Sequence, residues 1–171
     1  MPFLVIIYTE TKVYIMTYNQ AETTERKLLK EYAIPTFVER FTTEYIMSDI
    51  GSYDRKDMTL ILDGITYIVE AKCRVDVKEY YETKGLMMEL TKYKELSKLY
   101  PDNTILYISF INNTHFYIHN LKTILKDFTL NELLTYMDCP KNTCEDKGRK
   151  DKAVLLLPMG NKYCKKVIMN N

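Results

Sequence analysis

Two acids and a lysine lie at the ends of an otherwise largely apolar stretch, DMTLILDGITYIVEAK, residues 57–72. Asp57 opens the stretch, and Glu70 and Lys72 close it. Carboxylate oxygens are ligands that Mg²⁺ prefers, and a lysine beside a bound cation can orient or deprotonate a water molecule. If these three side chains meet, the two carboxylates could bind a divalent cation beside the lysine.

The middle of the stretch predicts how they meet. Asp63-Gly64 between two β-rich runs is typical of a two-residue hairpin turn. Counting outward from that turn brings Asp57 opposite Glu70, with their Cβ atoms roughly 4.5–5.5 Å apart. Lys72 projects from the same face of the strand as Glu70. A divalent cation would relieve the repulsion between the two acids; the alternative is that both acids simply face water at strand ends.

Hydrophobic periodicity and turn residues predict the elements around this hairpin. Besides the hairpin itself, with its second strand at 65–74, strands are expected at residues 3–8, 12–18, 104–111, 114–119 and 154–158, and a bent extended segment at 36–47. Helices are expected at residues 21–33, ended by Pro35, at 82–99 as one long helix, and in short pieces within 120–137. Loops are expected at residues 49–56 and 138–152.

These elements predict an α/β fold with a central mixed β-sheet flanked by helices. A helix joins strand 65–74 to strand 104–111, so these two strands should pair in parallel through a right-handed crossover. The hairpin is apolar on both faces and should lie centrally, covered on both sides. A chain of 171 residues has room for one domain with a substantial core, so residues 1–171 are expected to form a single domain, with an N-terminal hairpin and a C-terminal helical extension.

Charge and composition exclude several classes of function. With 24 basic and 23 acidic residues the net charge is +1, so nucleic-acid binding would need a local basic surface. The sequence contains no GxxxxGK[ST], HExxH or GxSxG motif, which leaves ATP use and serine or zinc hydrolysis without support. No stretch approaches the ~20 apolar residues of a membrane span and no basic segment precedes the first apolar run, so an intracellular protein without membrane contact is expected.

The cysteines and histidines give weaker indications. Cys139, Cys144 and Cys164 could ligate zinc, but their spacing matches no standard motif and reduced thiols are the favoured interpretation. His115 and His119 lie in an apolar, strand-like stretch and are interpreted as structural, with a metal or proton-relay role as the alternative.

The motif and the order of the elements resemble the PD-(D/E)xK nuclease superfamily. The residues that carry the resemblance are Lys56-Asp57 and Glu70-Ala71-Lys72. The proline that often precedes the first acid in this superfamily is Lys56 here. The resemblance implies a restriction-endonuclease-like core with the element order αβββαβ.

The resemblance extends upstream of the motif. Residues 25–29 (ERKLL) and 37–40 (FVER) look like the opening helix and first strand of archaeal Holliday-junction resolvases. It implies that Glu25 completes the acidic site, with Glu22 and Glu31 as rivals for that position.

Downstream, the long predicted helix is similar to one that often carries a glutamine in these nucleases. Glu89 is nearest that position here, with Tyr93 one turn on, so the role of this helix toward nucleic acid is in doubt. The resemblance covers roughly residues 20–112. It leaves the role of residues 120–171 open.

The resemblance implies a Mg²⁺-dependent nuclease that hydrolyses phosphodiester bonds, with Mn²⁺ as a substitute. Asp57, Glu70 and the Ala71 carbonyl would hold the metal, and Lys72 and Glu25 would complete the catalytic set. The expected activity is that of a DNA endonuclease, resolvase-like or selective for DNA structure, acting as a homodimer. Two alternatives stay open: an RNA endonuclease on the same site, and a non-catalytic module that binds nucleic acid or a partner protein.

Basic residues near the acids could contact phosphates. The candidates are Arg40, Arg55, Lys56, Arg74 and Lys78. The lysines of the long predicted helix, Lys84, Lys92, Lys94 and Lys98, are interpreted as a solvated face. Tyr80 and Tyr81 could stack on bases, although packing against a helix is the more common use of such residues.

Overall fold

The computed structural model describes residues 4–9, 12–17, 24–48, 55–75, 77–140 and 148–170. The strands are β1 (Leu4–Thr9), β2 (Lys12–Thr17), β3 (Thr43–Met47), β4 (Met58–Leu62), β5 (Ile65–Arg74), β6 (Leu86–Glu89), β7 (Thr104–Ile111), β8 (His115–Asn120), β9 (Leu134–Pro140), β10 (Arg149–Leu157) and β11 (Cys164–Ile168). The helices are η1 (Leu29–Ala33), a π-helical turn, α2 (Ile34–Val38), α3 (Glu79–Lys84), α4 (Leu90–Leu99), α5 (Leu121–Asp127) and α6 (Leu130–Leu133). Residues 24–28 are also helical and run directly into η1.

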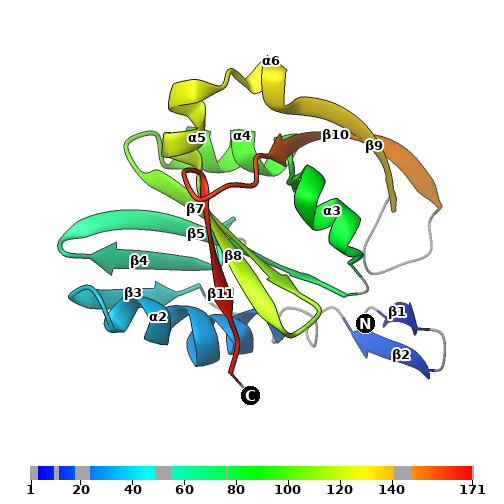
Figure 1. Cartoon of the computed structure of the whole chain (residues 1–171), viewed down its shortest axis with the longest axis horizontal. Helices are drawn as coiled ribbons and strands as arrows, with labels where there is room; N and C mark the ends of the chain where they lie inside the picture. The colour runs from blue at the N-terminus through cyan, green and yellow to red at the C-terminus, as the bar shows by residue number, and fades with distance from the viewer. Residues whose placement is uncertain are drawn as a thin grey trace.

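Within the described residues, the largest sheet has six strands in the order β11-β8-β7-β5-β4-β3. β5 and β7 are parallel, and the other neighbours are antiparallel, so the sheet is mixed as predicted. β6, β10 and β9 form a second sheet, and β1 pairs with β2 in a third. The chain is therefore an α/β fold in which β5 lies between β4 and β7 (Figure 1).

Apolar side chains cover both faces of the six-stranded sheet. On one face, the side chains of Leu29, Ala33 and Phe37 from η1 and α2 pack with Val69 and Leu106 of the sheet. On the other face, a second cluster joins β5 and β7 to α4, α5, α6 and the β6-β10-β9 sheet. Figure 1 shows these two groups of elements on opposite sides of the sheet. The central strands are thus buried on both faces, as their composition predicts.

The β4–β5 hairpin has the predicted turn and register, with one difference at its end. Asp63 and Gly64 adopt φ values of 49° and 80°, and the pairs run from Leu62–Ile65 to Met58–Val69. The predicted pair of Asp57 with Glu70 does not form. The chain leaves the ladder at Asp57, whose N–H donates instead to the Val69 carbonyl at 3.0 Å.

The sequence predicts that the first helix ends at Pro35, and this prediction is wrong. Pro35 lies in the first turn of α2, a position where a missing N–H is tolerated. The Thr36 hydroxyl also donates to the Tyr32 carbonyl at 2.8 Å across the junction. The prediction of an extended segment at residues 36–47 is therefore wrong for residues 36–42, and only Thr43–Met47 forms a strand.

The predicted long helix 82–99 is broken in the structure. Gly85 has φ 126°, and a Cβ at this position would lie 2.8 Å from the Leu157 carbonyl oxygen. The next four residues form β6, which pairs antiparallel with β10, and the helix α4 begins only at Leu90. The apolar spacing of this segment fits a helix locally, but pairing with a distant strand overrides it.

The predicted C-terminal helical extension is only partly correct. α5 and α6 lie where short helices are expected, but three strands follow them. β9 and β10 extend into the predicted loop 138–152, with their polar ends exposed, and residues 141–147 lie outside the described residues. β11 has no counterpart among the predicted elements. None of the described helices is long and apolar enough to cross a membrane.

Candidate functional site

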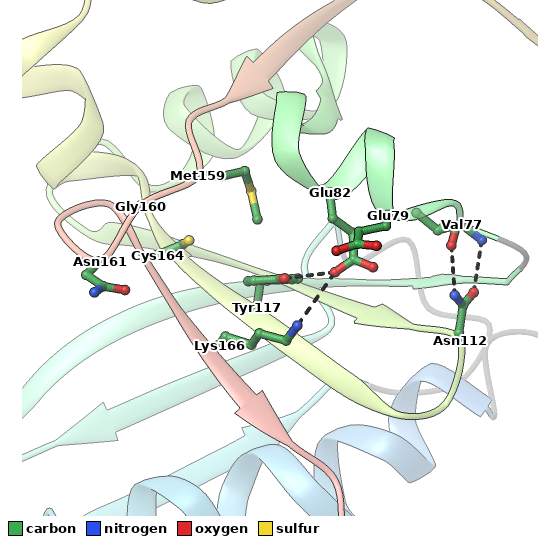
Figure 2. A pocket seen from close by; sticks show the side chains of 10 residues that line it. All are labelled: Val77, Glu79, Glu82, Asn112, Tyr117, Met159, Gly160, Asn161, Cys164 and Lys166. Atoms are coloured by element: carbon green, nitrogen blue, oxygen red, sulfur yellow. Dashed lines mark hydrogen bonds and ion pairs between the residues drawn. The ribbon is translucent and has the colours of Figure 1, made fainter.

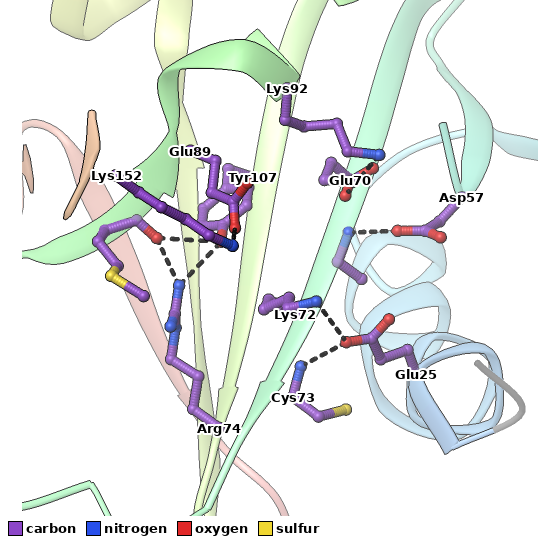
Figure 3. A network of polar contacts seen from close by, with 12 residues as sticks. Glu25, Asp57, Glu70, Lys72, Cys73, Arg74, Glu89, Lys92, Tyr107 and Lys152 are labelled. Carbon is purple, nitrogen blue, oxygen red and sulfur yellow. Dashed lines mark hydrogen bonds and ion pairs between the residues drawn. The ribbon is translucent and has the colours of Figure 1, made fainter. Parts of the chain in front are cut away.

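The second half of β5 has an edge that β4 does not cover. β7 pairs with β5 as far as Arg74, whereas the pairing of β4 ends earlier. Two carboxylates accept the backbone hydrogen bonds of this edge (Figure 3). Asp57 Oδ2 accepts from the Ala71 N–H at 2.7 Å, and Glu25 Oε1 accepts from the Cys73 N–H at 2.9 Å. Asp57 and Glu25 thus take the place of a neighbouring strand along this part of β5.

Glu70 and Lys72 alternate with these backbone groups and share one face of β5. The Glu70 side chain is buried, and one of its oxygens, Oε1, lies 3.1 Å from Lys92 Nζ of α4. Lys72 Nζ lies 3.9 Å from Glu25 Oε1. Figure 3 shows Glu25, Asp57, Glu70 and Lys72 around the same part of the strand. The structure therefore brings together all four side chains that the sequence analysis placed in the site.

Glu25 is distinguished from its two rivals by position. Glu31 is half-exposed and lies 3.7 Å from Lys27, one turn away on the same helix. Glu22 lies outside the described residues. Glu25 is the glutamate of the described helical segment that contacts β5.

Burial dominates the electrostatics of the site. It raises the pKa of Asp57 and of Glu25, and the backbone N–H of Ala71 and the Lys72 ammonium partly offset the effect at the respective acid. Burial and the nearby Asp57 carboxylate raise the pKa of Glu70 to about 8. Burial opposes a charge on Lys72, but Glu25, Tyr107 and Glu70 together outweigh it, and the pKa of Lys72 is raised. The acids are thus poorly solvated and would gain from a nearby positive charge.

Lys92 is the residue of this site that the sequence analysis missed. It was assigned to a solvated face of a long helix, and the structure contradicts this. α4 begins at Leu90, so Lys92 lies in the first turn, where its Nζ reaches Glu70 and also donates to the Arg55 carbonyl at 3.0 Å. No local signal in the sequence marks Leu90 as the start of the helix, because the break at Gly85 depends on the distant Leu157.

Arg74 was predicted to contact phosphates, but in the structure its guanidinium is directed into the protein. Nη2 donates to the Met87 carbonyl and, at 2.9 Å, to the Tyr107 hydroxyl (Figure 3). The Tyr107 hydroxyl in turn donates to the Met87 carbonyl at 3.1 Å. Arg74 therefore fastens β5 and β7 to β6.

Arg55 and Lys56 immediately precede Asp57 and lie beside α4. Arg55 is half-exposed, with Nε 3.9 Å from Glu95 Oε2. Lys56 Nζ donates to the Tyr100 hydroxyl at 2.8 Å and lies 4.8 Å from the centre of that ring. Of the predicted phosphate-binding residues, Arg55 and Lys56 are the two nearest to Asp57 in the sequence.

Arg40 and Lys78 do not join this group. Arg40 precedes β3, whose first residue pairs with Leu62 beside the hairpin turn. Asp57 is at the other end of β4, a strand of five residues that spans roughly 16 Å. Lys78 is exposed just before α3. The side chains of Tyr80 and Tyr81 lie outside the described residues.

A pocket of about 780 Å³ forms a second polar region, bounded by residues of α3, β8 and β11 (Figure 2). Glu82 lies at its centre, where Oε2 forms a 2.7 Å hydrogen bond with His115 Nε2 and accepts a 2.8 Å bond from the Tyr117 hydroxyl. Lys166 Nζ lies 4.0 Å away. Although burial opposes it, these hydrogen bonds lower the pKa of Glu82. The acids around β5 do not line this pocket.

The other residues considered for metal binding are dispersed. His119 is fully buried, and burial lowers its pKa to about 4. Cys139 on β9 and Cys164 on β11 are buried free thiols on different sheets, and Cys144 lies outside the described residues. In the described part of the chain, no group of three or more His, Cys, Asp or Glu side chains is arranged to hold a metal ion.

Of the groups around β5, the carboxylates of Asp57 and Glu70 and one backbone carbonyl are the candidate metal ligands. The carbonyl is that of Ala71, which is directed to the same side of the strand as its N–H, toward Asp57. Glu70 Oε2 is buried, and no described group donates to it. An acceptor of this kind is suited to a hard cation.

Comparisons of the chain with models of known families, with characterised proteins and with solved structures found no match.

Proposed function

We propose that this chain is a divalent-metal-dependent nuclease that hydrolyses phosphodiester bonds, and that its substrate is DNA cut internally. The observation that supports the proposal is the convergence of Glu25, Asp57, Glu70 and Lys72 on the uncovered edge of β5. The proposal is also supported by the element order around this edge, in which a helix, β3, β4, β5, α4 and β7 follow one another with α3 and β6 inserted after β5.

The donor set fits Mg²⁺ in kind. Asp57, Glu70 and the Ala71 carbonyl offer only oxygen, the atom that hard cations prefer. The orphaned Oε2 of Glu70 and the raised pKa of that carboxyl both indicate an acid that lacks compensation for its charge. When bound, Mg²⁺ would polarise the phosphate and acidify a water molecule.

The protein groups have separate tasks in this proposal. Lys72, whose ammonium lies 3.9 Å from Glu25 Oε1, would orient the attacking water and offset the negative charge that develops on the phosphate. Glu25 would hold Lys72 and the strand edge in place. Arg55 and Lys56 would bind phosphates on either side of the scissile bond, since they adjoin Asp57 in the chain.

A non-catalytic binding module is the second candidate, and one observation favours it. Lys72 and Lys92 already neutralise acids of the site, so the arrangement is satisfied in part without a metal ion. Such a module would bind nucleic acid or a partner protein with this face and would not cleave. An RNA endonuclease on the same site is a variant of the first proposal that only the choice of substrate distinguishes.

The test is cleavage of a labelled panel with Mg²⁺ or Mn²⁺. The panel contains a four-way junction, a flap, a linear duplex, single-stranded DNA and RNA. Lys72→Ala should reduce cleavage roughly 10²- to 10⁴-fold, the usual worth of a positioned acid–base group. Lys98→Ala, which removes an exposed lysine at the far end of α4, is the matched control and should cleave like the wild type.

Each outcome has a distinct meaning. Metal-dependent products that Lys72→Ala loses and Lys98→Ala retains would support the nuclease, and the preferred substrate would decide between DNA and RNA. Cleavage that Lys72→Ala retains would contradict the proposed site. Tight binding without cleavage of any substrate would favour the binding module.

A further inference from the structure

Among the described residues, Lys92 is the cation that forms an ion pair with Glu70. Its Nζ lies 3.1 Å from Glu70 Oε1, and the Glu70 side chain is only 11% exposed. The ammonium also favours the charged form of Asp57, whose pKa burial raises. Lys92 thus serves as a counter-ion to both acids that are proposed to bind the metal.

A divalent cation and this ammonium would compete for the same carboxylate. Two positive charges close together repel each other strongly where water is largely excluded. The ammonium has another partner in the Arg55 carbonyl, a neutral acceptor, and its side chain is 32% exposed. The lysine side chain is long and flexible, so it can turn toward solvent once the cation has replaced it beside Glu70.

We propose that Lys92 holds Glu70 in the metal-free protein and is released by a divalent cation to bind a phosphate of the nucleic acid. This inference rests on the proposed function for its metal and its substrate. Lys92 is then a positioning residue that couples metal binding to substrate binding. A lysine that merely fastens α4 to β5 would keep its contact with Glu70 whether or not metal is bound.

The first test follows the lysine directly. The wild-type protein is acylated at its lysines in EDTA and in Mg²⁺ at one pH, and the modification of each lysine is followed by mass spectrometry. We expect Lys92 to react severalfold faster in Mg²⁺. Lys94, which is exposed on the same helix, should react at the same rate in both conditions.

Binding of Mg²⁺ in the same samples is measured by the unfolding temperature. A rise in this temperature without faster modification of Lys92 would overturn the inference and leave the proposed nuclease standing. A protein that binds no Mg²⁺ or Mn²⁺ at all would overturn the proposed function, and the inference with it. The two failures are therefore distinguishable.

The second test measures the phosphate contact. Ca²⁺ takes the same oxygen ligands as Mg²⁺, and duplex binding is measured against salt concentration in Ca²⁺ and in EDTA. Each lysine–phosphate contact changes the log–log slope by about 0.9. We expect Lys92→Gln to lower the slope by about this amount in Ca²⁺ but not in EDTA. Lys94→Gln is the control, and an equal effect of Lys92→Gln in both conditions would refute the release.

Discussion

Single residues of this site serve the fold and the proposed chemistry together. Asp57 accepts the Ala71 N–H with Oδ2, and the same carboxylate is proposed to bind the metal. Glu25 likewise accepts the Cys73 N–H while it faces Lys72. Substitutions of either acid will therefore change stability as well as activity, and the two effects have to be measured separately.

Asp57→Ala should destabilise the metal-free protein by about 1–3 kcal/mol, because the Ala71 N–H would lose its acceptor in a partly buried position. Asp57→Asn keeps an oxygen that can accept this bond and should cost clearly less. Both should lose metal-dependent cleavage. The free energy of unfolding in urea with EDTA measures the first effect. Equal stabilities for the two variants would show that the hydrogen bond does not stabilise the edge.

The raised pKa of Glu70 predicts how stability depends on pH. Burial favours the protonated acid in the folded chain, up to a pKa of about 8, against an ordinary value of 4.5. The folded state therefore binds more protons between these values, and the stability of the metal-free protein should fall as the pH rises through this range.

Glu70→Gln should remove this fall. Relative to the wild type, the variant should gain stability with rising pH, by up to about 1.4 kcal/mol per pH unit, and should match the wild type near pH 4. Urea unfolding between pH 4 and 8.5 measures the difference. Glu44→Gln, at an exposed position of β3, should follow the wild-type profile. If the unfolding free energies of Glu70→Gln and the wild type differed by the same amount at every pH, the buried Glu70 charge would not be destabilising.

At the scale of elements, the sequence predicts turns and registers that depend on neighbouring residues, and it does not predict helix or strand boundaries that depend on segments far along the chain. Asp63-Gly64 defines its turn through its own backbone preferences, and the hairpin register follows by counting. Gly85 instead reflects the approach of Leu157, far along the chain, and no local pattern reveals it. Pro35 was read as a stop, although the first turn of a helix tolerates proline.

The site divides in the same way. Asp57, Glu70 and Lys72 belong to one hairpin, so their proximity could be predicted from its turn. Lys92 reaches them from α4, and its direction depends on where that helix begins. Because the start of α4 depends on β6 pairing with a distant strand, the sequence alone could not include Lys92 in the site.

Gly85→Ala should disrupt the junction between α3 and β6. The position combines φ 126° with a 2.8 Å approach of a new Cβ to the backbone oxygen of Leu157, so strain of about 1–3 kcal/mol adds to a steric clash. Gly64→Ala is the matched control, because φ is also positive there, at 80°, but no atom of the described residues lies within 4 Å of the new Cβ. It should cost only about 1–2 kcal/mol. Equal unfolding free energies for the two variants would refute the role of the contact.

At the scale of the molecule, the six-stranded sheet has β3 as one of its two edge strands. Ile46 and Tyr45 of this strand are 67% and 46% exposed. If the chain cuts both strands of a symmetric DNA substrate, as the resemblance of its sequence to resolvases implies, two copies should act together. A two-fold dimer is also the commonest form of assembly.

We therefore expect a homodimer at micromolar concentrations in sedimentation velocity. Ile46→Lys should favour the monomer if β3 forms the interface, because an inserted charge discourages pairing of edge strands. Lys98→Glu changes charge elsewhere on the surface and is the control. A wild-type monomer that still cuts both strands of a junction in one binding event would contradict the expectation.

The use of two acids to complete the edge of β5 has a consequence for how this chain can evolve. A lineage that lost cleavage would still be selected to keep Asp57 and Glu25, because β5 would otherwise expose unpaired N–H groups. Their retention among descendants would record folding rather than catalysis. Within the described residues, Glu70 accepts no such backbone bond and Lys72, a donor, cannot accept one, and the burial of Glu70 has an energetic cost. Those two positions should therefore be the first to be substituted in a lineage that has lost cleavage.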